Sequence, residues 1–232
     1  MVKYVPLHLH TEYSLLDGAI RIPDLFKFAA ENDMPAVAIT DHGTMFGCAD
    51  MFIAKNELLS HMLSDDEQEF KKKIEDVKPI IGCEFYVCDG DVIEDRSKKT
   101  MFHLVLLAKN QEGYHNLCKM DSIASTDAYY YKPRINHEIL EKHKEGIICL
   151  SACIQGEIAR NFLDGLETVA EESVKYYKNL FGEDFYIELQ DHGLKEQKDS
   201  NPFLMKMAEK YNIKTVITND SHYLRAQDAL WH

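Results

Sequence analysis

The chain has 232 residues, of which 45% are hydrophobic and 28% are charged, and it is long enough for one large α/β domain or two small ones. Its formal net charge of −13 argues against a free-standing duplex-DNA-binding protein, because such binding depends on neutralising phosphates with basic residues. There is no signal-peptide layout, no apolar run approaches the ~20 residues of a membrane span, and the six cysteines include no C-x-x-C pair; together these features predict a reducing, cytoplasmic setting.

Short apolar or β-branched runs alternate with helical patterns along the chain. The runs predict seven strands, at residues 4–9, 35–40, 79–87, 102–108, 146–151, 185–190 and 214–218. The helical patterns fall at residues 23–32, 47–61, 112–124, 156–162, 166–181 and 197–211. Three polar or aromatic stretches remain: residues 64–76 predict a solvated helix or an insertion, and residues 89–100 and 129–134 predict loops.

This alternation predicts parallel βα units in a single α/β domain, residues 1–232. An open doubly wound sheet would satisfy the same pattern. A distorted, TIM-like seven-stranded barrel explains better why polar residues follow nearly every strand, because functional residues of α/β barrels collect at the C-terminal ends of the strands.

The first predicted strand ends in His8-Leu9-His10, whose two imidazoles project to the same side because strand side chains alternate. Asp17 lies in the loop after this strand, and other side chains that can bind metals follow later strands or lie within them: His42, Glu84, Cys153, Asp220 and His222. His103 is the exception, since it opens the fourth run and reaches the same rim only if that strand runs in the opposite direction. A single histidine at a strand end is more often structural, but nine such residues predict a metal site at the C-terminal rim. Imidazoles, carboxylates and one thiol suit Zn²⁺, Mn²⁺ or Fe²⁺ rather than Ca²⁺.

Several motifs resemble those of PHP (polymerase and histidinol phosphatase) domains: His-x-His, Thr-Asp-His-Gly, Gly-Cys-Glu, Phe-His-Leu, Leu-Ser-Ala-Cys and Thr-Asn-Asp-Ser-His. Longer segments, such as HLHTEYSLLDGA, AITDHGTMFG, HLVLLAKNQEGYHNL and YYKPRI, are similar to the N-terminal PHP domains of bacterial replicative DNA polymerase III α subunits. The resemblance extends from about residue 3 to the end of the chain.

The resemblance implies a distorted seven-stranded βα barrel that holds up to three divalent metal ions. It assigns a first ion to His8, His10, Glu84 and Asp220. It assigns a second ion to Glu84, His103 and Cys153, and a third to Asp17, His42 and His222. Asp17 and Cys153 stand where the phosphatases of the family have histidines, but both side chains can still bind metals.

The chemistry implied is phosphoester hydrolysis, in which clustered divalent ions activate water. The resemblance makes the substrate the 3′ end of a DNA strand, with 3′→5′ proofreading exonuclease activity. We expect the chain to be an N-terminal fragment of a longer polymerase subunit, with the other α-subunit domains and replisome proteins as partners. Two alternatives stay open: a metal-binding structural module that supports the polymerase without hydrolysis, and a free-standing phosphatase of the histidinol phosphatase type.

A few further residues are candidates for roles around the site. Asp41 either orients a neighbouring imidazole or is an ordinary loop carboxylate. Arg134, and with less reason Lys132 and Arg21, are candidates to contact a substrate phosphate. Residues 129–131 are three tyrosines that could stack on bases or simply pack the loop. After the sixth strand, hydrogen bonding around the site is expected of Glu188, Gln190 and His192.

Overall fold

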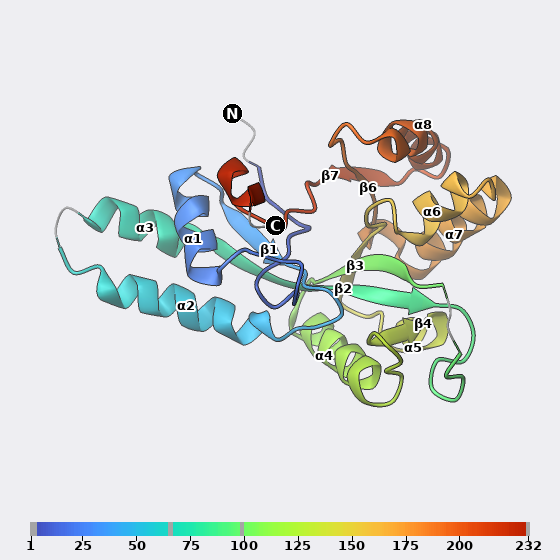
Figure 1. The fold of residues 1–232 in the computed structure, drawn as a ribbon, viewed down its shortest axis with the longest axis horizontal. Coiled ribbons are helices and arrows are strands. Elements are labelled where there is room, and N and C mark those ends of the chain that lie inside the picture. Colours follow the sequence, from blue (N-terminus) through green and yellow to red (C-terminus); the bar gives the residue numbers. More distant parts are fainter. Residues whose placement is uncertain (1–3, 65–66, 98–99, 231–232) are drawn as a thin grey trace.

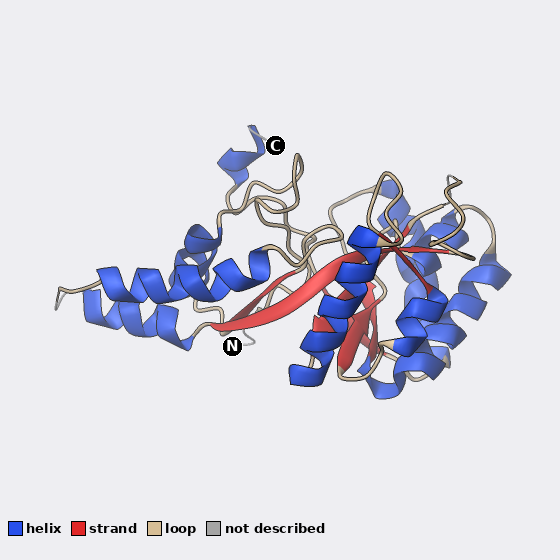
Figure 2. Ribbon diagram, turned by 90° about the horizontal axis from the view of Figure 1, so that it is seen from below, coloured by secondary structure: helices blue, strands red, loops and turns tan. Residues whose placement is uncertain are grey.

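The computed structural model describes residues 4–64, 67–97 and 100–230, and its core is one curled, mixed β-sheet (Figures 1 and 2). The strands are β1 (Ala36–Ile39), β2 (Lys78–Cys88), β3 (Phe102–Ala108), β4 (Arg134–Asn136), β5 (Ile147–Leu150), β6 (Phe185–Leu189) and β7 (Lys214–Ile217). The α-helices are α1 (Ile22–Glu31), α2 (Gly47–His61), α3 (Gln68–Asp76), α4 (Gln111–Thr126), α5 (His137–Lys142), α6 (Glu157–Leu163), α7 (Glu167–Phe181) and α8 (Lys195–Lys210). Two 3₁₀ helices are also described, η2 (Gly182–Asp184) and η3 (Ala226–Leu230).

The strand order is β1-β2-β3-β5-β6-β7, with β4 paired to β2. The long strand β2 joins the two parts of the sheet, because its first residues pair with β1 and its later residues pair with β3 (Figure 2). Strand β3 is antiparallel to both β2 and β5, whereas the other pairs are parallel. The expectation of parallel units throughout is therefore wrong for β3. The described residues of the connection from β2 to β3, 89–97 and 100–101, form no helix, and antiparallel neighbours need no crossover helix.

The predicted first strand, at residues 4–9, is not a regular strand. Its backbone is nevertheless held on both sides: Pro6 and Leu9 accept hydrogen bonds from Ala38 and Thr40, and His10 donates to Ser221. The segment therefore lies between β1 and the residues that follow β7, on the side of the barrel where the sheet is open. The expectation of a distorted seven-stranded α/β barrel is confirmed as a curled seven-stranded sheet. The segment at residues 4–9 is not one of its strands, and the seventh strand is instead β4, which pairs with β2.

Helices cover the sheet in two groups (Figure 1). Helices α1, α2 and α3 pack around β1 and share a core that includes Phe26, Val37 and Ile74. Helices α4, α7 and α8 contribute to the larger core on the other strands. Within the charge-dense stretch at 64–76, residues Gln68–Asp76 form α3, and residues 65–66 lie outside the described residues. Within the described part of the chain, no helix combines the length and the apolar character needed to cross a membrane.

Candidate metal centre

His8 and His10 are fixed by hydrogen bonds through their Nδ1 atoms. His8 Nδ1 lies 2.7 Å from Glu188 Oε1, and His10 Nδ1 lies 3.0 Å from Ser14 Oγ. Both imidazoles are fully buried, and the Nε2 atom of each makes no hydrogen bond. Because a carboxylate only accepts hydrogen bonds, Nδ1 of His8 carries a proton, and Nε2 is directed into the site. Burial lowers the pKa of His8, but the carboxylates of Glu188 and Asp220 raise it well above its usual range.

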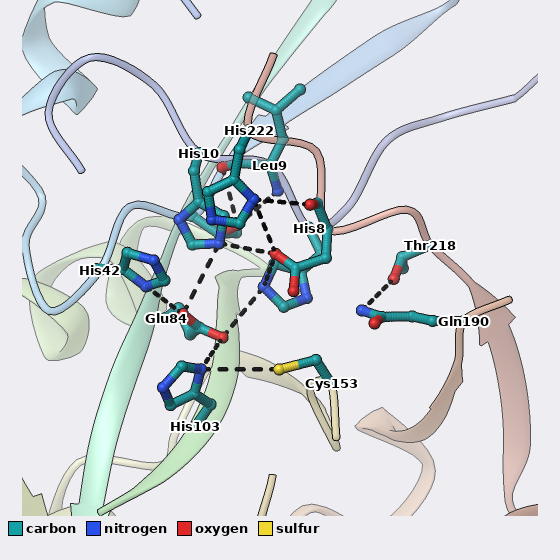
Figure 3. A network of polar contacts seen from close by, with 12 residues as sticks. His8, Leu9, His10, His42, Glu84, His103, Cys153, Gln190, Thr218 and His222 are labelled. Atoms are coloured by element: carbon teal, nitrogen blue, oxygen red, sulfur yellow. Dashed lines mark hydrogen bonds and ion pairs between the residues drawn. The ribbon is translucent and has the colours of Figure 1, made fainter. Parts of the chain in front are cut away.

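Glu84 stands at the middle of the cluster (Figure 3). One oxygen, Oε1, lies 2.8 Å from His103 Nδ1 and 3.2 Å from His8 Nε2, and the other accepts a hydrogen bond from His42 Nδ1. His103 reaches this position because β3 runs in the reverse direction, so that its first residues lie at the C-terminal end of β2. The exception noted in the sequence is therefore explained by the geometry of the sheet.

The loop after β7 brings in Asp220 and His222. Asp220 Oδ1 is 3.2 Å from His8 Nε2 and 3.1 Å from His10 Nε2, is buried, and makes no hydrogen bond. His222 stacks on His10 with ring centroids 4.3 Å apart. The outer side of the cluster is formed by Asp17, whose Oδ2 is 2.9 Å from His42 Nε2 and 3.6 Å from His222 Nε2.

Cys153 completes the set, with its Sγ 3.8 Å from His103 Nδ1. All nine side chains named from the sequence thus meet at one rim of the sheet. Three groups among them have ligand atoms within 4.8 Å of one another: His10, His42 and His222; His8, His10 and Asp220; and His42, Glu84 and His103.

The residues fit divalent metal ions. Three buried atoms without hydrogen bonds, His8 Nε2, His10 Nε2 and Asp220 Oδ1, face one another, and burying such atoms unpaired is costly. A cation between them would satisfy all three. Imidazole nitrogen, carboxylate oxygen and one thiol form a donor set that transition metals and zinc accept.

A cavity of about 880 Å³ opens beside the cluster. Six of the nine side chains line it: Asp17, His42, His103, Cys153, Asp220 and His222. Most of its other lining residues are apolar or aromatic, including Phe46, Tyr86 and Tyr131. The cluster is therefore accessible to a molecule larger than water.

The sequence profile described as PHP domain matches residues 6–192. The chain belongs to the PHP domain family. It is 43% identical to DNA polymerase III subunit alpha of Deinococcus radiodurans over 99% of the chain and 17% of that protein. It is 40% identical to DNA polymerase III subunit alpha of Borreliella burgdorferi over 98% of the chain and 19% of that protein. The chain is thus homologous to the N-terminal region of these subunits and spans less than a fifth of their length.

Solved structures share the fold of this PHP domain at low sequence identity. One, provisionally described as a metal-dependent phosphoesterase from Bifidobacterium adolescentis, aligns with a TM-score of 0.53 at 15% identity and covers 96% of this chain and 89% of its own. Another, an amidohydrolase from Chromobacterium violaceum, aligns with a TM-score of 0.54 at 13% identity and covers 94% and 87%. At such identities the likeness establishes the fold alone.

The charge states in the PHP domain suit cation binding. Burial raises the pKa of Glu84, but the charge of His103, the hydrogen bonds of His103 and His42 and the nearby His8 outweigh it, and the pKa lies well below its usual range. Burial also opposes ionisation of Asp220, yet His8 and His10 hold its pKa below its usual range. Burial lowers the pKa of His10 to about 4, so this imidazole is neutral at pH 7. Two carboxylates and a neutral imidazole therefore face the same space.

Cys153 differs from the other members of the cluster. Burial raises the pKa of its thiol well above the usual range, and the negative charges of Glu84 and Asp220 raise it further. The thiol is thus neutral as the structure stands, and binding a cation would have to displace its proton.

Asp41 is buried but contacts none of the imidazoles directly. Its carboxylate accepts hydrogen bonds from the Thr11 backbone N–H and hydroxyl and from the Ser14 hydroxyl, and Ser14 in turn accepts from His10. Asp41 therefore orients His10 through Ser14, rather than its sequence neighbour His42. The roles of Thr11 and Ser14 were not predicted from the sequence. The signal that could have indicated them is the polar string Thr-Glu-Tyr-Ser, which directly follows His10.

Glu188 and Gln190 form hydrogen bonds around the site, as predicted. Glu188 accepts hydrogen bonds from His8, Gln190 and Thr218, which fixes the ring of His8. Thr218 was missed, because only the pairing of β6 with β7 brings it to Glu188. His192 lines the cavity and bonds to Gln197.

The expectation that Arg134 contacts a substrate phosphate is not supported. Its side chain is fully buried, and the guanidinium donates to the carbonyl oxygens of Ala128, Val92 and Asp95 at 3.0, 2.9 and 3.4 Å. As the first residue of β4, it ties the preceding loop to the segment after β2. Lys132, two residues earlier, is exposed and lines the cavity instead.

Proposed function

We propose that this PHP domain is the phosphoesterase part of a bacterial DNA polymerase III α subunit and that it removes nucleotides from the 3′ end of DNA as a 3′→5′ proofreading exonuclease. Identities of about 40% over nearly the whole chain to α subunits support the first part. The other α-subunit domains and the replisome would then be its partners, in the reducing cytoplasm that the cysteine usage predicts.

One observation carries the catalytic part of the proposal: nine ligating side chains converge, and three of their buried atoms lack any hydrogen bond. His8, His10, Glu84 and Asp220 would hold one ion, and Glu84, His103 and Cys153 would hold a second. A third would be held by Asp17, His42 and His222. Zn²⁺, Mn²⁺ and Fe²⁺ suit these donors.

Divalent ions bound in this way would supply a Lewis acid that activates water and stabilises the oxygens of a phosphoester under attack. The protein contributes the rest. Glu188 and Ser14 hold the imidazoles of His8 and His10 so that Nε2 of each faces the centre. The adjoining cavity admits a nucleotide to the exposed side of the cluster.

The proposal is tested by digestion of a 5′-labelled single-stranded oligonucleotide with Mn²⁺ or Zn²⁺. We expect the wild type to produce a ladder that shortens from the 3′ end, and the His10→Ala, Asp220→Ala double variant to produce none. A His61→Ala, Asp24→Ala variant, which changes the same residue types at exposed positions outside the cluster, should digest like the wild type.

Other outcomes favour the alternatives. Equal digestion by the wild type and the His10→Ala, Asp220→Ala variant would point to a contaminating nuclease. Metal binding without any hydrolysis would favour the structural module. Hydrolysis of small phosphomonoesters alone would favour a phosphatase of the histidinol phosphatase type.

A further inference from the structure

The cavity beside the metal centre has an aromatic wall that the assignment of ligands does not explain. Phe46, Tyr129 and Tyr131 line it and are 68%, 50% and 74% exposed. Large apolar side chains this exposed gain little from folding, so their clustering at one opening indicates a binding surface. Lys132 is the one lysine or arginine that lines this cavity, and the described part of the chain gives it no carboxylate partner.

Hydrogen bonds from two arginines hold the loop at residues 129–133 in place. Arg134 donates to the carbonyl of Ala128, and Arg96 donates to the carbonyls of Asp127 and Tyr129. The Tyr130 N–H donates to the Lys132 carbonyl, and Tyr131 between them has a φ of 61°. A bulky residue rarely adopts this left-handed conformation, so the fold holds Tyr131 outward at an energetic cost.

The same loop packs against Tyr86 and Gly43, two residues that adjoin the proposed ligands His42 and His103. Lys132 Nζ lies 5.3 Å from the centroid of the Tyr86 ring, and that ring lies 5.3 Å from His103 and 6.2 Å from His42. Pro133 packs against Gly43, the residue after His42: a Cβ at position 43 would be only 2.5 Å from Pro133 Cγ. The aromatic loop and the cluster therefore form one continuous surface.

We propose that this surface binds the unpaired 3′-terminal nucleotides of a DNA strand. Tyr131 and Phe46 stack on bases, and Lys132 pairs with a backbone phosphate. Aromatic faces accept any base, but only where the base is free of a duplex stack. The net charge is −13, and Lys132 is the one basic side chain among the described residues that line the cavity. Binding of a long duplex through its phosphates would need many more basic side chains. The inference rests on the proposed function, and selects frayed or mismatched ends as its substrate class.

Binding can be measured separately from hydrolysis. The probe is a fluorescein-labelled, phosphorothioate single-stranded oligonucleotide, followed by anisotropy in Mn²⁺; the comparison probes are an abasic strand of equal length and a blunt duplex. We expect Tyr131→Ala and Phe46→Ala each to weaken binding of the single strand about tenfold, with little change for the abasic strand. Phe52→Ala, which truncates an exposed aromatic on α2 outside this cavity, is the matched control.

Lys132 is tested by salt dependence. Because one phosphate contact contributes about 0.7 to the slope of log K against log salt concentration for single strands, Lys132→Ala should reduce that slope by about this amount. Lys132→Arg should restore it, and Lys206→Ala, at an exposed position on α8, should leave it unchanged.

A structural role for Tyr131 is tested with bis(p-nitrophenyl) phosphate, which offers a phosphodiester without nucleobases. Loss of oligonucleotide digestion by Tyr131→Ala with unchanged cleavage of the small ester supports the inference. Loss of both, equal binding of the single strand and the duplex, or equal binding by the wild type and the aromatic variants overturns it. A wild type that binds single strands through Tyr131 but digests none supports the inference and counts against the proposed exonuclease.

Discussion

At the level of single residues, the orientation of His10 depends on one hydroxyl group. Ser14 Oγ accepts from His10 Nδ1, donates to Asp41 and also accepts from the His42 backbone N–H. Ser14→Ala removes all three contacts and leaves a buried Nδ1 unpaired. Since groups that orient metal ligands typically affect affinity 10- to 100-fold, we expect Zn²⁺ or Mn²⁺ binding to weaken by about that factor in calorimetric titrations.

The control for this change is Ser122→Ala. Ser122 is exposed on α4, and its hydroxyl bonds to the carbonyl of Cys118, within the same helix. Metal affinity should not change in this variant. Equal affinities in Ser14→Ala and the wild type would show that Ser14 does not position His10.

Arg134 illustrates how a charged residue can be structural. We expect Arg134→Met to lower the free energy of unfolding by about 3 kcal/mol, because up to three carbonyl oxygens lose a charged donor in the protein interior. Urea denaturation measures this effect. The half-buried Arg160 on α6, paired with Asp164 at the end of that helix, provides the control Arg160→Met, which should cost under about 1 kcal/mol. A small effect at Arg134 together with a raised KM for oligonucleotides would restore the phosphate-contact interpretation.

The side chains that meet in the cluster could be predicted from the sequence. The residues that hold those side chains in place could be predicted only in part. His8, Glu84 and Asp220 are visible in the sequence because polar side chains stand out within apolar runs or at their ends. The burial of Arg134 could not be predicted, because the polar and aromatic segment around it is typical of an exposed loop. The partnership of Thr218 with Glu188 depends on the register of β6 and β7, which no local pattern specifies.

At the level of elements, the turn after β1 links His42 to the aromatic loop. Gly43 has a φ of +59°, and a Cβ there would collide with Pro133, whereas Gly165, between α6 and α7, has a φ of +81° with open space around it. Both alanine variants suffer the left-handed penalty of about 1–2 kcal/mol. Only Gly43→Ala also creates a steric overlap with Pro133, which should lower the free energy of unfolding by a further amount of about 1–3 kcal/mol.

We therefore expect Gly43→Ala to be the less stable variant in urea denaturation and also to weaken binding of single-stranded DNA, by displacing the loop at residues 129–133. Gly165→Ala should bind DNA like the wild type. Similar losses of stability in the two variants would mean that the loop moves freely away from Gly43.

The direction and membership of strands were harder to predict than their existence. Six of the seven predicted runs became strands. Strands β1 and β5 are almost wholly buried, whereas β7 is largely exposed. The run at residues 4–9 contains Pro6 and lies where the sheet is open, so its hydrogen bonds to β1 and Ser221 do not extend into a ladder. Strand β4 is only three residues long and begins within a predicted loop, which left no periodic signal.

At the level of the whole molecule, a second polar network joins α5, α6 and α7. His137 Nε2 lies 3.1 Å from Glu157 Oε2, and Glu157 also accepts from Tyr177 and Ser173. Burial lowers the pKa of His137, but Glu157 raises it more, so the net shift is upward. Burial raises the pKa of Glu157, but these hydrogen bonds outweigh it, so the net shift is downward.

This pair makes stability depend on pH. The His137 contribution is complete below the unfolded pKa of about 6.5 and is lost as pH rises through the higher folded value. The Glu157 contribution is present above about 4.3 and is lost as pH falls through the lower folded value. We expect His137→Gln to cost about 1 kcal/mol at a pH of about 5.5 and less at a pH of about 9, as measured by urea denaturation. A cost that does not vary with pH would contradict the pairing.

Segments of the chain that are distant in sequence come together at one rim of the sheet, where we expect them to bind divalent metal ions. The most direct test is the number of ions retained after dialysis against Mn²⁺ or Zn²⁺, measured by mass spectrometry on the wild type and on Glu84→Gln. We expect two to three ions per chain in the wild type and at least one fewer in Glu84→Gln, because Glu84 lies between the histidines of two groups. A wild type that retains no ion, or a variant that retains as many as the wild type, would contradict the claim.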